Sequence, residues 1–340
     1  MKKKILSILL ICIMVIGLTG CGNKNDNKES SNNKSNGSKE VELYPVKVEE
    51  MEDYRGRYGY VNNKGQWVIE PQYISAGGFD PETGLAMVRM PKGDYAVGFI
   101  NKKGEMVLDG FGSYSTHSFK NGYAVIDTDV HHDTYSTKKL IDKYGKEIIE
   151  AGKYEKMTDV SSDGILAVSE YTTSDVKVIK LDGTVLFELP YSGIMSNYQN
   201  LSAFNKNGYA YCDSEIIDKD GNKIKAEKGK IQSLNDNNYG FIEYDYKSAI
   251  FTIKDGKIEL ITDFIYKYPK SFNNENISLV HEENEEMYYF VDVNGKKIND
   301  KTYKSAEMLL DGKWVVKLED GSNQVLNADG SILVDTFKVK

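Results

Sequence analysis

A polar corner that ends in glycine recurs along this chain, each time between two short apolar runs. The first copy, Val61-Asn62-Asn63-Lys64-Gly65, precedes the apolar run Trp67-Val68-Ile69. This pattern is typical of a β-hairpin with a type I turn and a G1 bulge. In such a turn the Asn62 side chain bonds the turn backbone, and Gly65 adopts a positive φ without the steric cost of a Cβ atom.

The corner glycines recur at intervals of 35 to 41 residues. They are Gly65, Gly104, Gly145, Gly183, Gly221, Gly256, Gly295 and Gly330. Asn or Asp stands three residues before six of these eight glycines, and Lys180 and Ile253 are the exceptions. A second strand-like segment, such as Gly84-Leu85-Ala86-Met87-Val88, follows the hairpin in most copies. A fixed period of this length indicates a repeat architecture.

The two ends of the repeat array complement each other. Leu43–Val48 looks like the second segment without a hairpin before it, and 324–334 is a hairpin without the second segment. Short segments such as Gly78-Phe79 suggest one more strand per repeat. We therefore predict an all-β, propeller-like ring of seven to eight small blades, closed by pairing the first strand with the last. The alternative is an open β-solenoid or a curved array of hairpins.

The N-terminus carries the features of an export signal. Three lysines precede a 13-residue apolar stretch, and Leu18-Thr19-Gly20-Cys21 resembles the bacterial lipoprotein lipobox. The resemblance implies that residues 1–20 are removed and that Cys21 is lipidated, which would anchor the protein at the extracytoplasmic face of the cell membrane. Residues 21–40 comprise that cysteine and a polar, disordered tether, and 41–340 form the repeat domain.

The net charge and the cysteine content limit the classes of function that this chain can have. The chain has a net charge of −8, and loss of the three N-terminal lysines makes it more negative. Nucleic-acid binding is not expected, because no basic stripe is present to neutralise phosphates. Beyond the export signal and Cys21, Cys212 stands alone in the sequence, so we expect no disulfide within the repeat domain.

The first repeat closely resembles the bacterial WG-repeat (WG containing repeat) family. The matching elements run from Gly59-Tyr60-Val61 through the Asn62–Gly65 corner and Trp67-Val68-Ile69 to Pro71-Gln72-Tyr73. The second repeat keeps Gly98–Gly104 but has Met106 in place of the aromatic residue. The resemblance implies an all-β surface or secreted protein without established catalytic residues.

Few motifs in the sequence suggest catalytic or metal-binding chemistry. Asp218-Lys219-Asp220-Gly221-Asn222 begins like a calcium loop, but Gly229 stands where the distal glutamate should be, so a hairpin turn is expected. His131-His132-Asp133 offers metal-ligand types, yet neighbouring residues of an extended strand point to opposite faces. We predict no metal, no cofactor and no catalytic residues.

Two insertions interrupt the repeat period, at about 127–137 and 191–200. In an up-and-down blade both belong on one face, opposite the glycine turns. Because binding residues often lie on loops, we predict a binding surface there. Its candidate residues are His131, His132, Tyr135, Tyr191, Met195 and Tyr198.

These features predict a non-catalytic, lipid-anchored repeat protein outside the cytoplasm. Its partners would be the membrane, through the anchor, and a protein, peptide or cell-wall glycan. One alternative is a propeller-type glycan hydrolase or lyase, which would need two carboxylates about 5–9 Å apart in a pocket. Another is a purely structural envelope protein.

Overall fold

The structure is a computed structural model that describes residues 41–48, 56–91, 96–112, 116–128, 137–170, 175–190, 200–282 and 285–338. Residues Val41–Lys340 form one compact unit. Its regular secondary structure is a series of antiparallel strands. No helix in the described segments is long and apolar enough to cross a membrane. The all-β prediction is confirmed.

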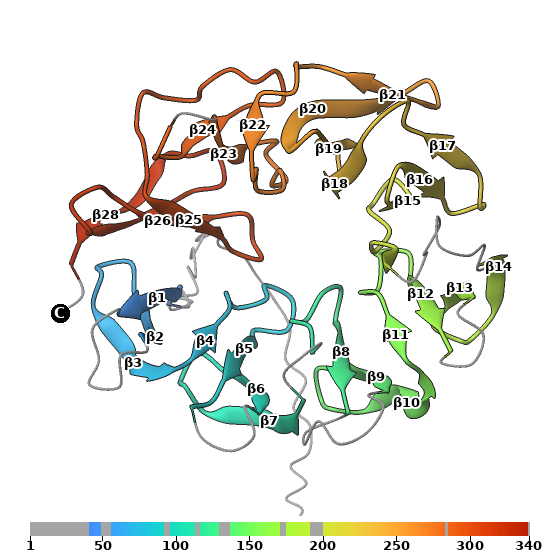
Figure 1. Ribbon diagram of the computed structural model, residues 1–340. Helices are drawn as coiled ribbons and strands as arrows, with labels where there is room; N and C mark the ends of the chain where they lie inside the picture. Colours follow the sequence, from blue (N-terminus) through green and yellow to red (C-terminus); the bar gives the residue numbers. More distant parts are fainter. Residues whose placement is uncertain are drawn as a thin grey trace, which may run out of the picture. The chain divides into compact units, whose positions relative to one another are not determined.

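The strands form eight consecutive blades arranged as a ring (Figure 1). Blade one contains β1 (Tyr44–Val48), β2 (Arg57–Val61) and β3 (Trp67–Tyr73), and blade two contains β4 (Ser75–Ala76), β5 (Ala86–Arg89), β6 (Val97–Ile100) and β7 (Met106–Phe111). Blade three contains β8 (Tyr123–Asp127), β9 (Lys138–Asp142) and β10 (Glu147–Tyr154). Blade four contains β11 (Lys156–Met157), β12 (Ile165–Ser169), β13 (Val176–Lys180) and β14 (Val185–Leu189).

Blade five contains β15 (Tyr209–Cys212), β16 (Glu215–Asp218) and β17 (Lys223–Lys225), and blade six contains β18 (Lys230–Leu234), β19 (Tyr239–Tyr244), β20 (Lys247–Lys254) and β21 (Lys257–Leu260). Blade seven contains β22 (Tyr266–Lys267), β23 (Ser278–Glu282) and β24 (Tyr289–Val291). Blade eight contains β25 (Ser305–Met308), β26 (Trp314–Lys317), β27 (Asn323–Leu326) and β28 (Ile332–Phe337).

A complete blade runs from the inside of the ring outwards, as β4-β5-β6-β7 and β25-β26-β27-β28 do in Figure 1. The first strand is short, and the third and fourth form the glycine-cornered hairpin. In blade two the short first strand is Ser75–Ala76, so the expected strand at Gly78-Phe79 lies slightly too late in the sequence. Phe79 instead packs on Tyr60, with ring centroids 5.0 Å apart.

The hairpin corners have the predicted geometry. All eight corner glycines have φ between 69° and 85°. In the first corner, Asn62 Oδ1 accepts hydrogen bonds from the Lys64 and Gln66 amides, at 2.8 and 3.1 Å. Asp218 does the same with Asp220 and Asn222, which confirms a hairpin turn at the calcium-like motif.

One exception to the Asx pattern has a simple geometric reason. Lys254 pairs directly with Lys257, so Asp255 and Gly256 alone form a two-residue turn, with φ of 48° and 70°. Positive φ at both central residues is the signature of a type I′ turn. Ile253 is therefore a strand residue and not the start of a turn.

The turn before each second strand also needs a positive φ. Gly84, Gly122, Gly164, Gly208 and Gly312 supply it in five blades. Asn238 (φ 66°) and Asn276 (φ 60°) supply it in blades six and seven, since asparagine tolerates this region better than most residues. Gly240, which the repeat pattern aligns with these glycines, lies instead inside β19.

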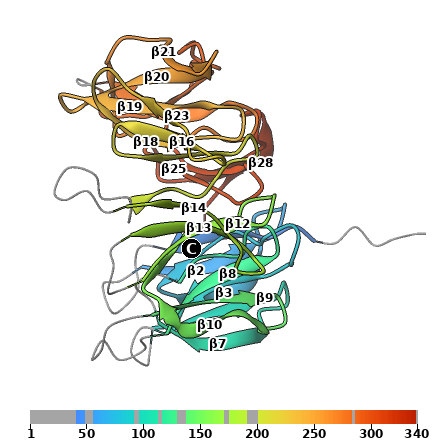
Figure 2. The ribbon, with the colours of Figure 1, turned by 90° about the vertical axis from the view of Figure 1, so that its right-hand side faces the viewer.

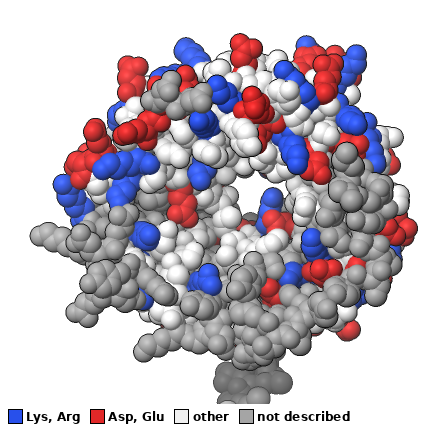
Figure 3. Space-filling view, viewed as in Figure 1, with Lys and Arg blue, Asp and Glu red and all other residues white. Residues whose placement is uncertain are grey.

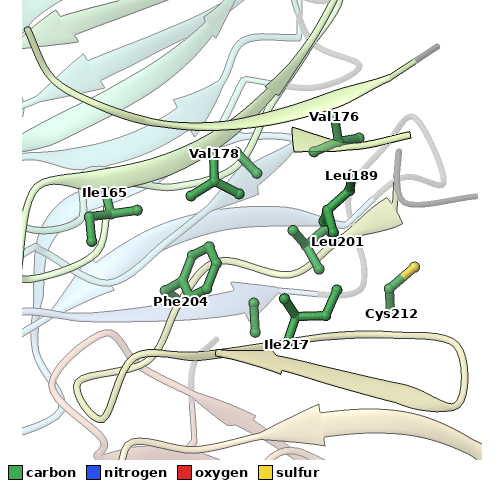
Figure 4. Close-up of a cluster of buried hydrophobic side chains, with 10 residues drawn as sticks. Ile165, Val176, Val178, Leu189, Leu201, Phe204, Cys212 and Ile217 are labelled. Atoms are coloured by element: carbon green, nitrogen blue, oxygen red, sulfur yellow. The ribbon is translucent and has the colours of Figure 1, made fainter. Parts of the chain in front are cut away.

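Strand direction gives the ring two distinct faces. The turn face carries the corner turns between third and fourth strands and the turns between first and second strands. The loop face carries the connections between second and third strands and those between successive blades. Apolar clusters fill the spaces between blades, such as the cluster of Val178, Phe204, Ile217 and their neighbours between blades four and five (Figure 4).

Buried asparagines connect neighbouring blades on the turn face. Asn205 Nδ2 donates to the Asn235 carbonyl at 2.8 Å, Asn235 Nδ2 to the Asn273 carbonyl at 3.1 Å, and Asn273 Nδ2 to the Gly312 carbonyl at 3.0 Å. Each Oδ1 accepts amides of its own turn, as Asn205 does from Asn207 and Tyr209. This asparagine ladder, Asn205, Asn235 and Asn273, fixes blades five to eight relative to one another.

The ring closes between blades one and eight by side-chain packing. Tyr44 and Val46 of β1 lie in one buried cluster with Val325 and Val334 of blade eight, and Leu333 packs against it. The predicted pairing of first and last strand is wrong, because β1 pairs with β2 and β28 pairs with β27. The misprediction came from splitting the chain at the hairpins, whereas a complete blade starts at the short inner strand.

Candidate functional site

The predicted site residues lie in segments outside the described residues. These are His131, His132, Tyr135, Tyr191, Met195 and Tyr198. The strands that precede the two insertions are β8, a second strand, and β14, a fourth strand. Both therefore end on the loop face.

The residues on either side of the first insertion are well packed. Asp127 ends β8 and Lys138 begins β9, with their charged groups 3.5 Å apart and both side chains buried. Beside them, Thr128 donates its amide and its hydroxyl to the Thr137 carbonyl, at 3.1 and 2.8 Å. An ion pair this buried depends on both partners, because either charge alone would be costly to bury.

Aromatic side chains occupy the described part of the loop face in blade six. Tyr244, at the end of β19, contacts Phe264 with ring centroids 5.8 Å apart. The Lys228 ammonium lies over both rings, 5.1 Å and 4.8 Å from their centroids. Cation–π contacts of this kind hold the rings and the charge in a fixed arrangement.

A second group of rings lies in blade seven. His281 is the penultimate residue of β23. Its ring contacts those of Tyr288 and Tyr268, at centroid distances of 4.8 and 6.1 Å. Tyr268 is 76% exposed. Both interactions bring exposed or half-buried aromatic faces to the same end of the sheet.

The two groups are joined by a seam between blades six and seven. Ser248 of β20 pairs with Tyr266 of β22, so the two blades share one seven-stranded sheet. Tyr246, 83% exposed, lies in the turn just before β20, and Tyr268 follows β22. We call Tyr244, Tyr246, Phe264, Tyr268, His281 and Tyr288 the aromatic surface.

Tyr246 and Tyr268 hold an unusual backbone conformation. Their φ angles are 61° and 45°, in the left-handed region that bulky side chains rarely occupy. At Tyr246 the positive φ belongs to the two-residue turn Asp245-Tyr246, with φ of 52° and 61°, as in a type I′ turn. Two highly exposed tyrosines with positive φ thus lie on either side of the seam.

Tyrosine rings suit partner binding for physical reasons. A ring supplies a large contact area at little cost in rotamer entropy, and its hydroxyl can bond polar groups. The seam joins the two groups of rings through a backbone strand pairing, and a preorganised surface loses less entropy on binding. The aromatic surface thus presents both apolar ring faces and phenolic hydroxyls.

The centre of the ring is open, and both basic and acidic side chains reach its margin (Figure 3). His117 Nδ1 lies 2.6 Å from Asp159 Oδ1, between blades three and four. Burial opposes ionisation of Asp159, but the hydrogen bond and charge of His117 outweigh it and lower the pKa of the carboxyl. Within the described ranges, no three His, Cys, Asp or Glu side chains gather as a metal site.

Cys212 belongs to the buried cluster between blades four and five. Burial raises the pKa of its thiol to about 11. Because the thiolate is the reactive form, this cysteine is chemically inert near neutral pH.

Family comparison matches two segments, residues 58–90 and 98–129, to the WG containing repeat. These two segments are similar to WG repeats. Each begins in a hairpin of one blade and ends in the second strand of the next or just beyond it, so a WG repeat straddles two blades. Among curated proteins, no sequence matches the chain.

Solved structures that match this chain share little sequence with it. A eukaryotic initiation factor is 13% identical, with 88% of this chain and 96% of that chain covered and a TM-score of 0.48. The dihydro-heme d1 dehydrogenase NirN is 12% identical (88% and 72% covered, TM-score 0.49). BamB from Moraxella catarrhalis is 10% identical (74% and 83% covered, TM-score 0.44).

The WG motif itself has a structural explanation. A Cβ atom at Gly59 would come 2.5 Å from the Ile69 carbonyl oxygen, and one at Gly98 would come 2.8 Å from the Leu108 carbonyl oxygen. The bulged fourth strand thus approaches the third too closely for any side chain. The small residue, the Asx turn and the corner glycine of the motif all serve the hairpin.

Sequence reasoning missed the aromatic surface and the asparagine ladder. Tyr244-Asp245-Tyr246 did not stand out, because it interrupts no repeat period and tyrosine is common in this chain. The ladder had a visible signal: Asn205, Asn235 and Asn273 all stand at the start of the turn before a second strand.

Proposed function

We propose that this WG-repeat chain is a lipid-anchored, extracytoplasmic binding protein that engages a protein, peptide or cell-wall glycan without catalysing a reaction. The observation that carries the proposal is the aromatic surface, a rigid and exposed group of rings on the loop face. The non-catalytic role is supported by the WG motif, whose residues each have a structural task in the hairpin.

Replacing Tyr246 and Tyr268 together by asparagine is expected to weaken partner binding at least tenfold while leaving the fold intact. Each change removes an exposed ring, and asparagine is better suited than tyrosine to the positive φ at these sites. Binding is measured by pull-down of peptidoglycan fragments and of secreted proteins, which separates a glycan from a protein partner.

The matched control is Tyr144→Asn, which removes a tyrosine that is 79% exposed in a hairpin corner on the turn face. It should leave binding unchanged. Equal binding by the double variant and the wild type, at equal melting temperature, would show that the aromatic surface is not the site.

Cys21→Ser is expected to release the protein from the membrane fraction or to leave it as an uncut precursor. The lipobox pattern Leu18–Cys21 is the reason, because the thioether cannot form on serine. Membrane fractionation and the mass of the N-terminal peptide check the result. A mature, membrane-bound variant would contradict lipid anchoring.

A further inference from the structure

The inner edge of blade one differs from that of every other blade. In the other seven, a residue of the first strand or its equivalent segment bonds the second strand. Examples are the amides of Ile74 and Gly77, which donate to the Arg89 and Met87 carbonyls at 2.9 Å. In blade one, β1 already occupies the second position, and only Val41 to Leu43 precede it among the described residues.

Register identifies which groups of β1 face this open edge. Met87 pairs with Phe99 in blade two, and Pro45 pairs with Tyr60 at the same position of blade one. By the same register Lys47 corresponds to Arg89. Among the described residues, no backbone amide donates to the Pro45 or Lys47 carbonyl on this side. Proline fits here, because an edge strand does not need its missing amide.

A cleft of about 620 Å³ lies beside this edge. Pro45 and Lys47 line it from blade one, and Ser305–Met308, the inner strand β25, lines it from blade eight. Figure 1 shows β1 of blade one and β25 of blade eight on the two sides of the ring closure. The volume falls within the range of about 300–1,000 Å³ common for ligand sites.

The cleft is basic although the chain as a whole is acidic. Its described lining includes Lys47, Lys270 and Lys317, with Glu307 as the acidic member. The confined position of Glu307 raises the pKa of its carboxyl, and the charge of Lys270 opposes that shift. Lys47 and Lys270 beside a single acidic residue of the described lining favour a ligand that brings carboxylates of its own.

We propose that an extended peptide with acidic side chains binds in this cleft and pairs with β1 as the inner strand of blade one. Its backbone would donate to the Pro45 and Lys47 carbonyls and accept from the Lys47 amide, as in other cases of strand addition to a sheet edge. Its carboxylates would lie near Lys47 and Lys270. The site is separate from the aromatic surface and does not depend on the function proposed above.

The tether of the same chain is the competing occupant. Residues 22–40 contain four lysines and three acidic residues, so their net charge is positive. A positive segment gains nothing from a basic cleft. An acidic peptide from another molecule therefore fits the charge of the site better.

The test uses the full-length protein in detergent and a fluorescein-labelled Glu-Val-Glu-Val-Glu peptide, with binding read as fluorescence anisotropy. Lys47→Gln removes one charge and should weaken binding about threefold. Lys47→Pro also removes the amide that faces the open edge, and should weaken binding at least tenfold. Lys64→Gln, in an exposed turn, should change nothing.

Two further arms test strand pairing and the occupant. A peptide N-methylated at alternate positions, which cannot pair fully, should bind at least tenfold more weakly, and Lys-Val-Lys-Val-Lys should not bind. Equal affinities of the Lys47→Pro and Lys47→Gln variants, or of the methylated and plain peptides, would overturn strand addition. Replacing 22–40 by glycine and serine should leave affinity unchanged, and a rise of more than threefold would assign the cleft to the tether.

Discussion

Gly240→Ala is expected to reduce the free energy of unfolding by about 3 kcal/mol, at the upper end of the cost of overpacking. A Cβ atom at this position would lie 1.9 Å from the backbone oxygen of Ser233 and 2.8 Å from the Phe251 ring. The carbonyl belongs to the neighbouring strand β18, so it can retreat only if the pairing of β18 with β19 is disturbed. Urea unfolding followed by circular dichroism measures the loss.

Gly77→Ala is the matched control for this variant. Gly77 also has no positive φ, but its Cβ would meet its nearest neighbours at 3.7 Å, an ordinary contact. We expect a change within about 0.5 kcal/mol there, as for substitutions away from packed features. Similar losses for both variants would mean that close strand approach is not what requires Gly240.

Asn273→Ala is expected to cost about 3 kcal/mol or more. The Asn273 side chain is buried, and its Oδ1 accepts the Glu275 and Ile277 amides at 3.0 and 2.9 Å. Its Nδ2 donates to the carbonyls of Gly312 and Ala328, at 3.0 and 2.7 Å. Alanine leaves these four backbone groups without their partner. The bonds to Gly312 and Ile277 are buried, and each buried group left unpaired costs about 1–3 kcal/mol.

Asn273→Asp separates the two roles of this side chain. Aspartate retains an acceptor for the turn amides but presents an oxygen, instead of Nδ2, to the two carbonyls of blade eight. If contact between blades dominates, Asn273→Asp should be as destabilising as Asn273→Ala near neutral pH. Asn101→Ala, in an exposed corner with the same turn bonds, should cost about 1 kcal/mol or less. A cost for Asn273→Ala no larger than this would exclude a structural role for the asparagine ladder.

The hairpins were predictable because their determinants are local. A type I turn with a G1 bulge favours an Asx side chain at its start and requires a positive φ three residues later. Asn62 and Gly65 supply both within four positions. The ring was predictable from the repeat period, but the way it closes was not, because β1 and β28 do not pair. These turns can be recognised from the sequence without knowledge of contacts between distant segments.

The parts that were missed depend on contacts between segments far apart in the sequence. The role of Gly240 depends on the approach of β18, and the role of Asn273 depends on carbonyls 39 and 55 residues later. The aromatic surface forms because β20 and β22 pair across two blades. Two-residue strands such as Ser75–Ala76 carry no pattern that could reveal them.

The ring is closed between blades one and eight by side-chain contacts alone among the described residues. Every other pair of neighbouring blades is joined by the chain itself, and blades six and seven also share a sheet. Blades one and eight are held by apolar side chains and the contact of Glu42 with Lys313. Among the described residues, this is the junction between neighbouring blades that would separate without breaking the chain or a strand pairing.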